Sequence, residues 1–399
     1  MAVTPPWRLR RAGGLIGVIT AAVLSAATLP AHAVPQGHVH GAGAPGSVGD
    51  SYIVTLKAGT EARSKAGTEV ATAHGARIRQ VYDAALNGYA VRTDAAGARR
   101  LAADPRVAAV TQDARVHVED VQQDPPWNLD RLDQIQPPLD HRYAWPESGG
   151  RGVSVYLIDT GVRATHRDFG GRVDTGWDFV DGDAVAEDEN GHGTHVAGTV
   201  AGATHGVAKK ARIVPVRVLD GTGSGTLAQV IAGIDWVTRH ARKPAVANMS
   251  LGGYANAQLD AAVRASIASG VTYTVAAGND GLPAELDSPA RVREAVTVGA
   301  TGRQDARAAF SNFGPSLDLF APGVSVTSAG HTSDTATATF SGTSMAAPHA
   351  AGAAALLLSV RPTASPAEVS RALTARAAPG VVSGPGRGSP NKLLQVNPR

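Results

Sequence analysis

The sequence contains no cysteine among its 399 residues, and only 5% of them are aromatic. Without cysteine the chain cannot form a disulfide scaffold, a Cys-ligated zinc site, an iron–sulfur cluster or a thiol nucleophile. Any covalent catalysis must therefore use another side chain. The 46 glycines and 24 prolines are too few for a low-complexity chain. With 43% hydrophobic residues, the chain can bury one large core or two moderate ones.

The chain also lacks a large net charge, which is only +3 at pH 7. Residues 1–119 carry 13 Lys and Arg against 8 Asp and Glu, whereas the remaining 280 residues carry 24 against 26. The excess of positive charge therefore belongs to the N-terminal third. Because a nucleic-acid-binding protein concentrates positive charge on its working domain, we do not expect nucleic acid as a partner.

The N-terminus has the pattern of a secretory signal peptide. Three arginines (Arg8, Arg10 and Arg11) precede an apolar stretch over residues 15–29, and the small–x–small sequence Ala31-His32-Ala33 follows it. The apolar stretch is short for a membrane span and no charged stop-transfer segment comes after it. We therefore predict a signal peptide over residues 1–33, export of the chain, and no membrane anchor.

The exported chain divides into two parts of different character. Residues 34–49 are rich in Gly, Pro, Ala and His and are predicted to form a linker. Residues 50–119 then show the order strand, helix, strand, strand, helix, strand, with Asp94 as the N-cap of the second helix. This order is typical of the ferredoxin-like split βαβ arrangement, so we predict a small α+β domain here.

Residues 120–399 form the second part. Apolar Val/Ile/Ala strands, such as residues 153–158, 213–219 and 246–249, alternate there with helical patterns. A long Ala-rich helix is predicted over residues 343–360. Near-continuous apolar strands separated by helices indicate a mostly parallel sheet covered by helices on both faces, a three-layer α/β/α fold. In such a sheet the functional loops follow the carboxyl ends of the strands.

Three residues in Gly-flanked loops carry the strongest chemical signal. Asp159 ends a strand, His192 begins a helix of small residues, and Ser344 lies in the first turn of the long helix. Each residue alone could have a purely structural role, as a turn residue, a buried histidine or an N-cap. Together they form a Ser–His–Asp set in the chain order Asp, His, Ser, which is the order found in subtilisin.

Five sequence strings strengthen this interpretation: Asp159-Thr160-Gly161, residues 190–198, residues 248–253, residues 276–279 and residues 342–349. They closely resemble the subtilisin-like serine proteases, and the similarity to the proteinase K and aqualysin branch extends over residues 120–399. Residues 50–119 similarly resemble the inhibitory propeptide of these enzymes. Positions near Glu189 and Gly221, where this branch often has cysteines, depart from the pattern.

The resemblance implies a secreted serine endopeptidase with a subtilisin-like fold, made as a zymogen. Ser344 would be the nucleophile, His192 the general base, Asp159 its partner and Asn279 the oxyanion-hole donor. The implied substrate-binding residues are Gly223, Ser224, Gly225, Ser250, Leu251, Gly252, Ala277 and Gly278. Because this lining is uncharged, an apolar or broad preference is expected for P1, the substrate residue on the acyl side of the cleaved bond. The expected partners are polypeptide substrates and the chain's own propeptide, acting as inhibitor and chaperone, and a monomer is expected.

The resemblance also implies structural calcium and no organic cofactor. One site would use the carboxylate of Asp318 with the backbone carbonyls of Arg293 and Ala295. A second would use Asp130, Asp133 and Gln134. Two other functions stay open on the sequence. A catalytically dead homologue would act as a binding protein, and His192 with His195 could bind a metal in a metal-dependent hydrolase, although the H-E-x-x-H acid is missing.

Overall fold

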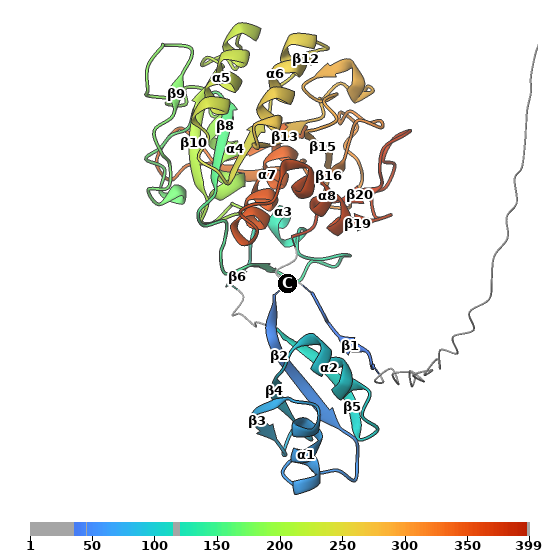
Figure 1. The fold of residues 1–399 in the computed structure, drawn as a ribbon. Helices are drawn as coiled ribbons and strands as arrows, with labels where there is room; N and C mark the ends of the chain where they lie inside the picture. The colour runs from blue at the N-terminus through green and yellow to red at the C-terminus, as the bar shows by residue number, and fades with distance from the viewer. Residues whose placement is uncertain (1–35, 45, 115–119, 397–399) are drawn as a thin grey trace, which may run out of the picture. The chain divides into compact units, whose positions relative to one another are not determined.

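The computed structural model describes residues 36–44, 46–114 and 120–396, in two compact units that divide near residue 116. The predicted signal peptide lies outside the described residues. The first unit contains a five-stranded sheet in the order β1-β5-β2-β4-β3. Its elements are β1 (Val39–His40), β2 (Ser47–Leu56), α1 (Lys65–Ala73), β3 (Arg77–Tyr82), β4 (Gly88–Arg92), α2 (Ala95–Ala102) and β5 (Val107–Ala114) (Figure 1).

The predicted split βαβ order is present in this unit, and Asp94 caps α2 by accepting a hydrogen bond from the Gly97 amide. The expected linker over residues 34–49 differs from the structure. Val39–His40 adds a parallel edge strand to β5, and β2 begins at Ser47. The Gly- and Pro-rich composition of residues 34–49 hid β1 and the first residues of β2, because two-residue edge pairing leaves no hydrophobic alternation in the sequence.

The second unit is built on a nine-stranded sheet in the order β19-β20-β16-β15-β13-β11-β8-β10-β9, parallel except for the β19–β20 pair. Its strands are β8 (Ser154–Asp159), β9 (Trp177–Asp178), β10 (Arg212–Arg217), β11 (Ala245–Met249), β13 (Thr272–Ala276), β15 (Val296–Thr301), β16 (Leu319–Pro322), β19 (Ala378–Pro379) and β20 (Lys392–Leu393). The prediction of a mostly parallel sheet is confirmed.

Helices cover both faces of this sheet, and the alternation of side chains along β8 shows how (Figure 1). Val155 and Leu157 pack in the core shared with α4 (His192–Ala201), α7 (Thr343–Val360) and α8 (Pro366–Arg376). Tyr156 and Ile158 point to the opposite face and pack with α5 (Leu227–His240) and α6 (Ala257–Ala268). Because both faces are buried, β8 shows a continuous apolar run instead of an alternating one.

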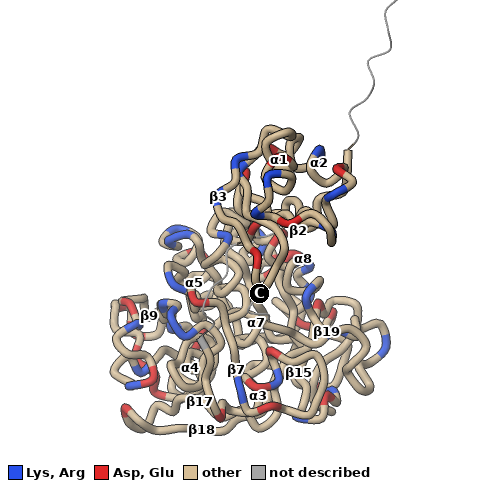
Figure 2. The backbone as a smooth tube through the Cα atoms, turned by 90° about the horizontal axis from the view of Figure 1, so that it is seen from below, with Lys and Arg blue, Asp and Glu red and all other residues tan. Residues whose placement is uncertain are grey.

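Helix α7 passes through the interior of the unit and carries no charged residue, so Figure 2 draws it in tan. Among the described residues, it is also the helix long and apolar enough to cross a membrane. Since 83% of it is buried within the protein, it is a core helix. Short elements complete the unit: β6 (Asp120–Gln123), α3 (Trp127–Asp130), β7 (Arg142–Trp145), β12 (Gly253–Tyr254), β14 (Asp287–Ser288), β17 (Val326–Ala329), β18 (Thr337–Phe340) and the 3-10 turns Arg167–Phe169 and Ala284–Leu286.

Candidate active site

The loops at the carboxyl ends of the strands bring Asp159 and His192 together. Asp159 is the last residue of β8 and His192 the first of α4, and the Asp159 Oδ1 to His192 Nδ1 distance is 2.7 Å. Asp159 is 1% exposed, whereas a quarter of the His192 side chain reaches solvent. Burial alone would lower the pKa of His192, but the charge and hydrogen bond of Asp159 and the charge of Asp188 together outweigh it and raise the pKa above 6.5. The imidazole therefore keeps its proton to a higher pH than a free histidine.

The start of α4 depends on a glycine. Gly191, the residue before His192, has a φ of 104°, in the left-handed region. A Cβ atom there would also lie 2.3 Å from His331 Nδ1. Glycine is therefore the residue that lets the chain turn into α4 with His192 at its first position.

A buried carboxylate that the sequence analysis did not single out holds these loops. Asp188 is 4% exposed and accepts hydrogen bonds at both oxygens, from the Thr160 and Thr194 hydroxyls and from backbone amides, including that of Gly191. The Thr160 hydroxyl oxygen in turn accepts from the Gly193 amide at 2.9 Å. Asp188 thus connects the residues that follow Asp159 to those that flank His192. Its signal in the sequence, one acid in an acidic segment, was indistinguishable from its neighbours.

Ser344 lies in the first turn of α7 and is tied to the strand-end residue Ser250. Pro348 has no amide hydrogen, so the Ser344 carbonyl lacks its usual helical partner four residues on. That carbonyl instead accepts a hydrogen bond from Ser250 Oγ at 2.8 Å. The Ser344 Oγ donates to the Ser250 carbonyl at 3.0 Å, and the structure gives no hydrogen bond between the Ser344 and His192 side chains. In the resting geometry the hydroxyl therefore faces Ser250, a loose arrangement common in enzymes without substrate.

The side chain of Asn279 is oriented by Thr343. Its Oδ1 accepts from the Thr343 amide at 2.8 Å and from the Thr343 hydroxyl at 2.9 Å. With the carbonyl end fixed in this way, the Nδ2 donor faces the start of α7, 3.7 Å from where a Cβ of Gly342 would lie. Asn279 is exposed. It can therefore donate a hydrogen bond to an oxygen bound beside Ser344.

A groove of about 670 Å³ passes along His192. Two segments predicted to bind substrate line it, residues 223–225 and residues 250–252. A second cavity, of about 200 Å³, contacts Ser344 and Asn279 and shares residues 251–253 with the groove. Gly278 lines this second cavity, but Ala277 is fully buried in the core and lines neither space.

The lining of the second cavity differs from the uncharged one expected from the sequence. Asp280 and Asp287 are both part of it. Asp287 arrives there because β14 pairs with β12, placing Asp287 opposite Tyr254 in the register. Such two-residue pairing cannot be read from residue spacing, so the sequence analysis missed these carboxylates.

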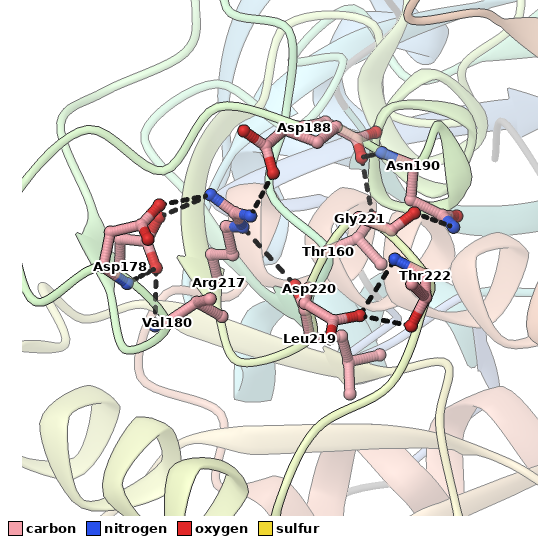
Figure 3. Close-up of polar contacts among 12 residues, drawn as sticks. Thr160, Asp178, Val180, Asp188, Asn190, Arg217, Leu219, Asp220, Gly221 and Thr222 are labelled. Carbon is pink, nitrogen blue, oxygen red and sulfur yellow. Dashed lines mark hydrogen bonds and ion pairs between the residues drawn. The ribbon is translucent and has the colours of Figure 1, made fainter.

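An ion-pair network fixes the loops beside the groove. Arg217, 3% exposed, contacts the carboxylate of Asp178 at 2.9 Å (Figure 3). It also contacts the carboxylates of Asp181 at 3.0 Å and Glu189 at 2.7 Å. Asn190 Nδ2 also donates to the Gly221 carbonyl at 3.1 Å. These polar contacts connect the acidic segment to β10.

Two further histidines, His195 and His349, are structural. His195 is fully buried, Nε2 contacts the Val326 carbonyl at 2.9 Å, and burial lowers its pKa to about 4. Its ring stacks on Phe340, and no metal-binding group of three or more His, Cys, Asp or Glu occurs among the described residues. His349 is also fully buried and pairs with Asn128 at 2.9 Å.

Comparison with known proteins decides what this arrangement is. Residues 150–393 match the model of the subtilase family of peptidases, and residues 51–119 match the peptidase inhibitor I9 family. The chain belongs to the subtilase family. It is a secreted serine proteinase made with a propeptide, and its fold is subtilisin-like.

Individual relatives cover most of this subtilase. An extracellular serine proteinase of Thermus sp. is 54% identical over 320 residues, which cover 80% of this chain and 78% of the relative. A cuticle-degrading serine protease of Arthrobotrys oligospora is 41% identical, over 94% of this chain and 98% of the relative. The crystal structure of a cold-adapted subtilisin-like serine proteinase is 50% identical, with a TM-score of 0.67, covering 69% of this subtilase and 99% of that chain.

Two loops of the subtilase carry the oxygen atoms expected to bind calcium. Asp130, Asp133 and Gln134 each bury a side-chain oxygen that has no hydrogen-bond partner. Burial raises the pKa of Asp133 to about 7. At the other loop, Asp318 Oδ2 accepts from the Thr297 amide at 2.8 Å, and burial raises the pKa of Asp318 to about 6. Buried oxygens without partners are what a hard cation requires, so the first set fits Ca²⁺.

Proposed function

We propose that this subtilase is an endopeptidase that uses Asp159, His192 and Ser344 as its catalytic triad. The observation that carries the proposal is the 2.7 Å bond between Asp159 and His192 at one edge of the sheet, on a groove adjoining the cavity of Ser344. The alternative of a catalytically dead homologue loses support, because all four residues expected for catalysis are present: His192, Ser344 and Asn279 border these spaces and the buried Asp159 contacts His192. The metal-hydrolase alternative loses its second ligand, because His195 points into the core.

In the proposed reaction, Ser344 Oγ leaves the Ser250 carbonyl and attacks the peptide carbonyl carbon, while His192 Nε2 accepts its proton. Asp159 holds His192 with Nδ1 protonated and stabilises the imidazolium. The oxyanion accepts hydrogen bonds from Asn279 Nδ2 and the Ser344 amide. When the C–N bond breaks, His192 protonates the leaving amine, and water then hydrolyses the acyl-enzyme by the reverse roles.

The substrate main chain is proposed to lie between residues 223–225 and residues 250–252, pairing as an added strand. Both segments line the groove beside His192. The P1 side chain is proposed to enter the cavity beside Ser344, whose lining departs from the uncharged one on which the apolar or broad preference rested. The walls formed by Leu251, Ala276 and Gly278 accept aliphatic surface, but the two carboxylates make the cavity unlike a purely apolar one.

Maturation is proposed to follow the expected domain boundaries: a signal peptide over residues 1–33, residues 34–49 before the propeptide, the propeptide over residues 50–119 and the catalytic domain over residues 120–399. The proposed cleavage lies near residues 119–121, and residues 115–119 are outside the described part. Asp120–Gln123 forms β6, paired with β7 in the catalytic unit. This pairing supports a boundary before β6. We also propose that the propeptide inhibits the monomeric enzyme until it is degraded.

A serine-directed sulfonyl fluoride tests the proposed chemistry. We expect it to abolish peptidase activity by sulfonylating Ser344 Oγ with loss of fluoride, and to add its mass to the peptide containing Ser344. The calcium chelator EGTA should cause only slow loss of activity, through lost stability. Immediate loss that zinc restores, or a fully labelled Ser344 with undiminished activity, would contradict the proposal.

Calcium is proposed to stabilise the fold through Asp130, Asp133 and Gln134, and through Asp318 with the carbonyls of Arg293 and Ala295. Because the ion binds only the folded state, calcium at about 100 times its Kd adds about 2.7 kcal/mol to the free energy of unfolding. When bound, it neutralises buried carboxylates.

We expect Asp133→Asn to remove most of the rise in melting temperature that calcium produces at this loop, with a much smaller effect on initial kcat. Thermal unfolding of the sulfonyl-fluoride-inactivated enzyme, with and without calcium, measures this. Asp318→Ala is expected to behave in the same way at the other loop. The matched control is Asp235→Asn, which removes one exposed carboxylate on α5. An Asp133 variant whose calcium response equals that of the control would show that this loop binds no calcium.

A further inference from the structure

The cavity beside Ser344 is lined by two carboxylates and by no Lys or Arg side chain. Asp287 and Asp280 both line it, and neither forms an ion pair with any residue that the structure describes. Because the cavity contacts Ser344 and Asn279, it lies where the P1 side chain sits under the proposed mechanism. Two unpaired carboxylates in one partly desolvated cavity raise each other's free energy. A bound positive charge would offset this cost.

Asp287 is held in place by a buried amide. Asn312 is fully buried and its Nδ2 donates to Asp287 Oδ2 at 2.7 Å. The Asn312 Oδ1 accepts from the Asp280 and Leu282 amides at 3.0 and 2.9 Å, so the amide cannot turn over without losing both bonds. Asp287 Oδ1 has no hydrogen bond among the described residues. One oxygen of the carboxylate is therefore anchored and the other is available to a ligand.

Gly278 leaves space for the Asp287 carboxylate at the cavity wall. Its φ is 102°, and a Cβ atom there would lie 2.6 Å from Asp287 Oδ2 and 2.3 Å from Asn312 Nδ2. A side chain at this position would therefore displace the anchored carboxylate. The glycine explains how a charged group can border a cavity whose other walls are aliphatic or backbone.

We propose that Asp287 is a specificity-determining residue that binds a basic P1 side chain, lysine or arginine, in this cavity. The aliphatic stem of the side chain lies along Leu251 and Ala276, and its charged end reaches Asp287, with Asp280 adding negative potential. Burial and then the charge of Asp280 raise the pKa of Asp287, so the carboxylate is destabilised while the cavity holds no cation. A bound ammonium or guanidinium group removes this cost and forms a charge-assisted hydrogen bond.

This inference rests on the proposed function, and it revises the apolar or broad P1 preference expected from the sequence. The test uses two pairs of chromogenic peptides that are identical except at P1, one pair with Arg and Phe and the other with Lys and Leu. For each enzyme the ratio of kcat/KM values within a pair is measured. The ratio cancels any general loss of activity that a variant suffers.

We expect the unaltered enzyme to favour the basic member of each pair, and Asp287→Asn to lower the ratio about tenfold or more, the size expected for one charge-assisted contact. Asparagine keeps the shape and can still accept from Asn312. Asp280→Asn should lower the ratio less. Asp235→Asn removes the same charge at an exposed position on α5 and should leave the ratio unchanged.

Benzamidine supplies a second readout, because it needs no turnover. Its inhibition constant should rise in Asp287→Asn by a similar factor. The proposal is overturned if the unaltered enzyme favours Phe and Leu, or if Asp287→Asn leaves both the ratio and the benzamidine constant unchanged. Failure of the proposed function looks different: no peptide of either kind would be cleaved, or sulfonylation of Ser344 would leave cleavage intact.

Discussion

Replacing Ser344 by alanine is expected to lower kcat by about 10⁶-fold, the loss measured for the catalytic serine of subtilisin. The physical reason is that no other nucleophile is free to replace it: the chain has no cysteine, and the Ser250 hydroxyl holds the Ser344 carbonyl. The other hydroxyls of the cavity beside Ser344 are engaged as well, since Thr343 donates to Asn279 and Ser288 donates to Asp260. Single-turnover and steady-state assays on purified, propeptide-free enzyme measure the loss. Because the variant is not expected to process itself, a separate protease removes its propeptide before the assay.

Asn279→Ala is expected to lower kcat by a smaller factor than Ser344→Ala, and it serves as the comparison variant. Loss of one oxyanion-hole donor costs about 10²–10³-fold in kcat, again as measured for subtilisin. Ser344→Ala must therefore be the more damaging of the two by several orders of magnitude. Equal losses, or a Ser344→Ala enzyme that keeps a tenth of its activity, would mean that the triad is assigned to the wrong residues.

The mass of the same variant tests maturation. If cleavage near residues 119–121 is performed by the enzyme itself, Ser344→Ala keeps residues 34–119 attached, while the unaltered chain loses them. Expression in a host without extracellular proteases keeps other enzymes from making the cut. Equal processing of both chains in that host would show that the cleavage is not self-catalysed.

The fold was largely predictable because its strands and helices carry strong periodic signals. The continuous apolar run of β8 and the uncharged α7 could each be bounded to within a residue from the sequence, and comparison with relatives confirms the family. The missed elements include α8 and β16, but most are shorter: Val39–His40, Asp287–Ser288 and Gly253–Tyr254 each pair through two residues. Pairings of this length are decided by tertiary packing rather than by residue pattern.

The site shows the same division. Asp159, His192 and Ser344 could be chosen because their residue types, order and flanking glycines fit one chemistry. The residues that position these three or line the cavity beside them could not be chosen from the sequence. Asp188 gains its role from donors that come from three separate loop positions, and Asp287 reaches the P1 cavity only through the β12–β14 pairing. Their functions depend on distances that residue spacing along the chain does not contain.

Arg131 is the basis of the second large effect, which is on stability. Its side chain is 1% exposed and makes a two-pronged ion pair with Asp305, at 2.8 Å from Nε to Oδ1 and 2.9 Å from Nη2 to Oδ2. It also donates to the carbonyls of Gln134 and Ile135. One guanidinium thus connects the proposed calcium loop to the loop of Asp305.

Arg131→Met is expected to lower the free energy of unfolding by about 3–5 kcal/mol, because it leaves a buried carboxylate and two carbonyls without partners. At about 2–4 °C per kcal/mol, the melting temperature should fall by on the order of 10 °C. Differential scanning calorimetry of the sulfonyl-fluoride-inactivated enzyme avoids self-digestion. Arg239→Met is the matched control, since it breaks an exposed ion pair with Asp235 worth about 0.5 kcal/mol.

The double variant Arg131→Met with Asp305→Asn separates the ion pair from the packing of the long side chain. Asp305 has a φ of 59°, a left-handed conformation that asparagine also tolerates, so the second change adds little backbone strain. Removing both charges should restore part of the stability lost in Arg131→Met, because no uncompensated charge stays buried. If the two losses simply add, the pair contributes no coupling, and Arg131 stabilises the fold through packing and its two carbonyl contacts alone.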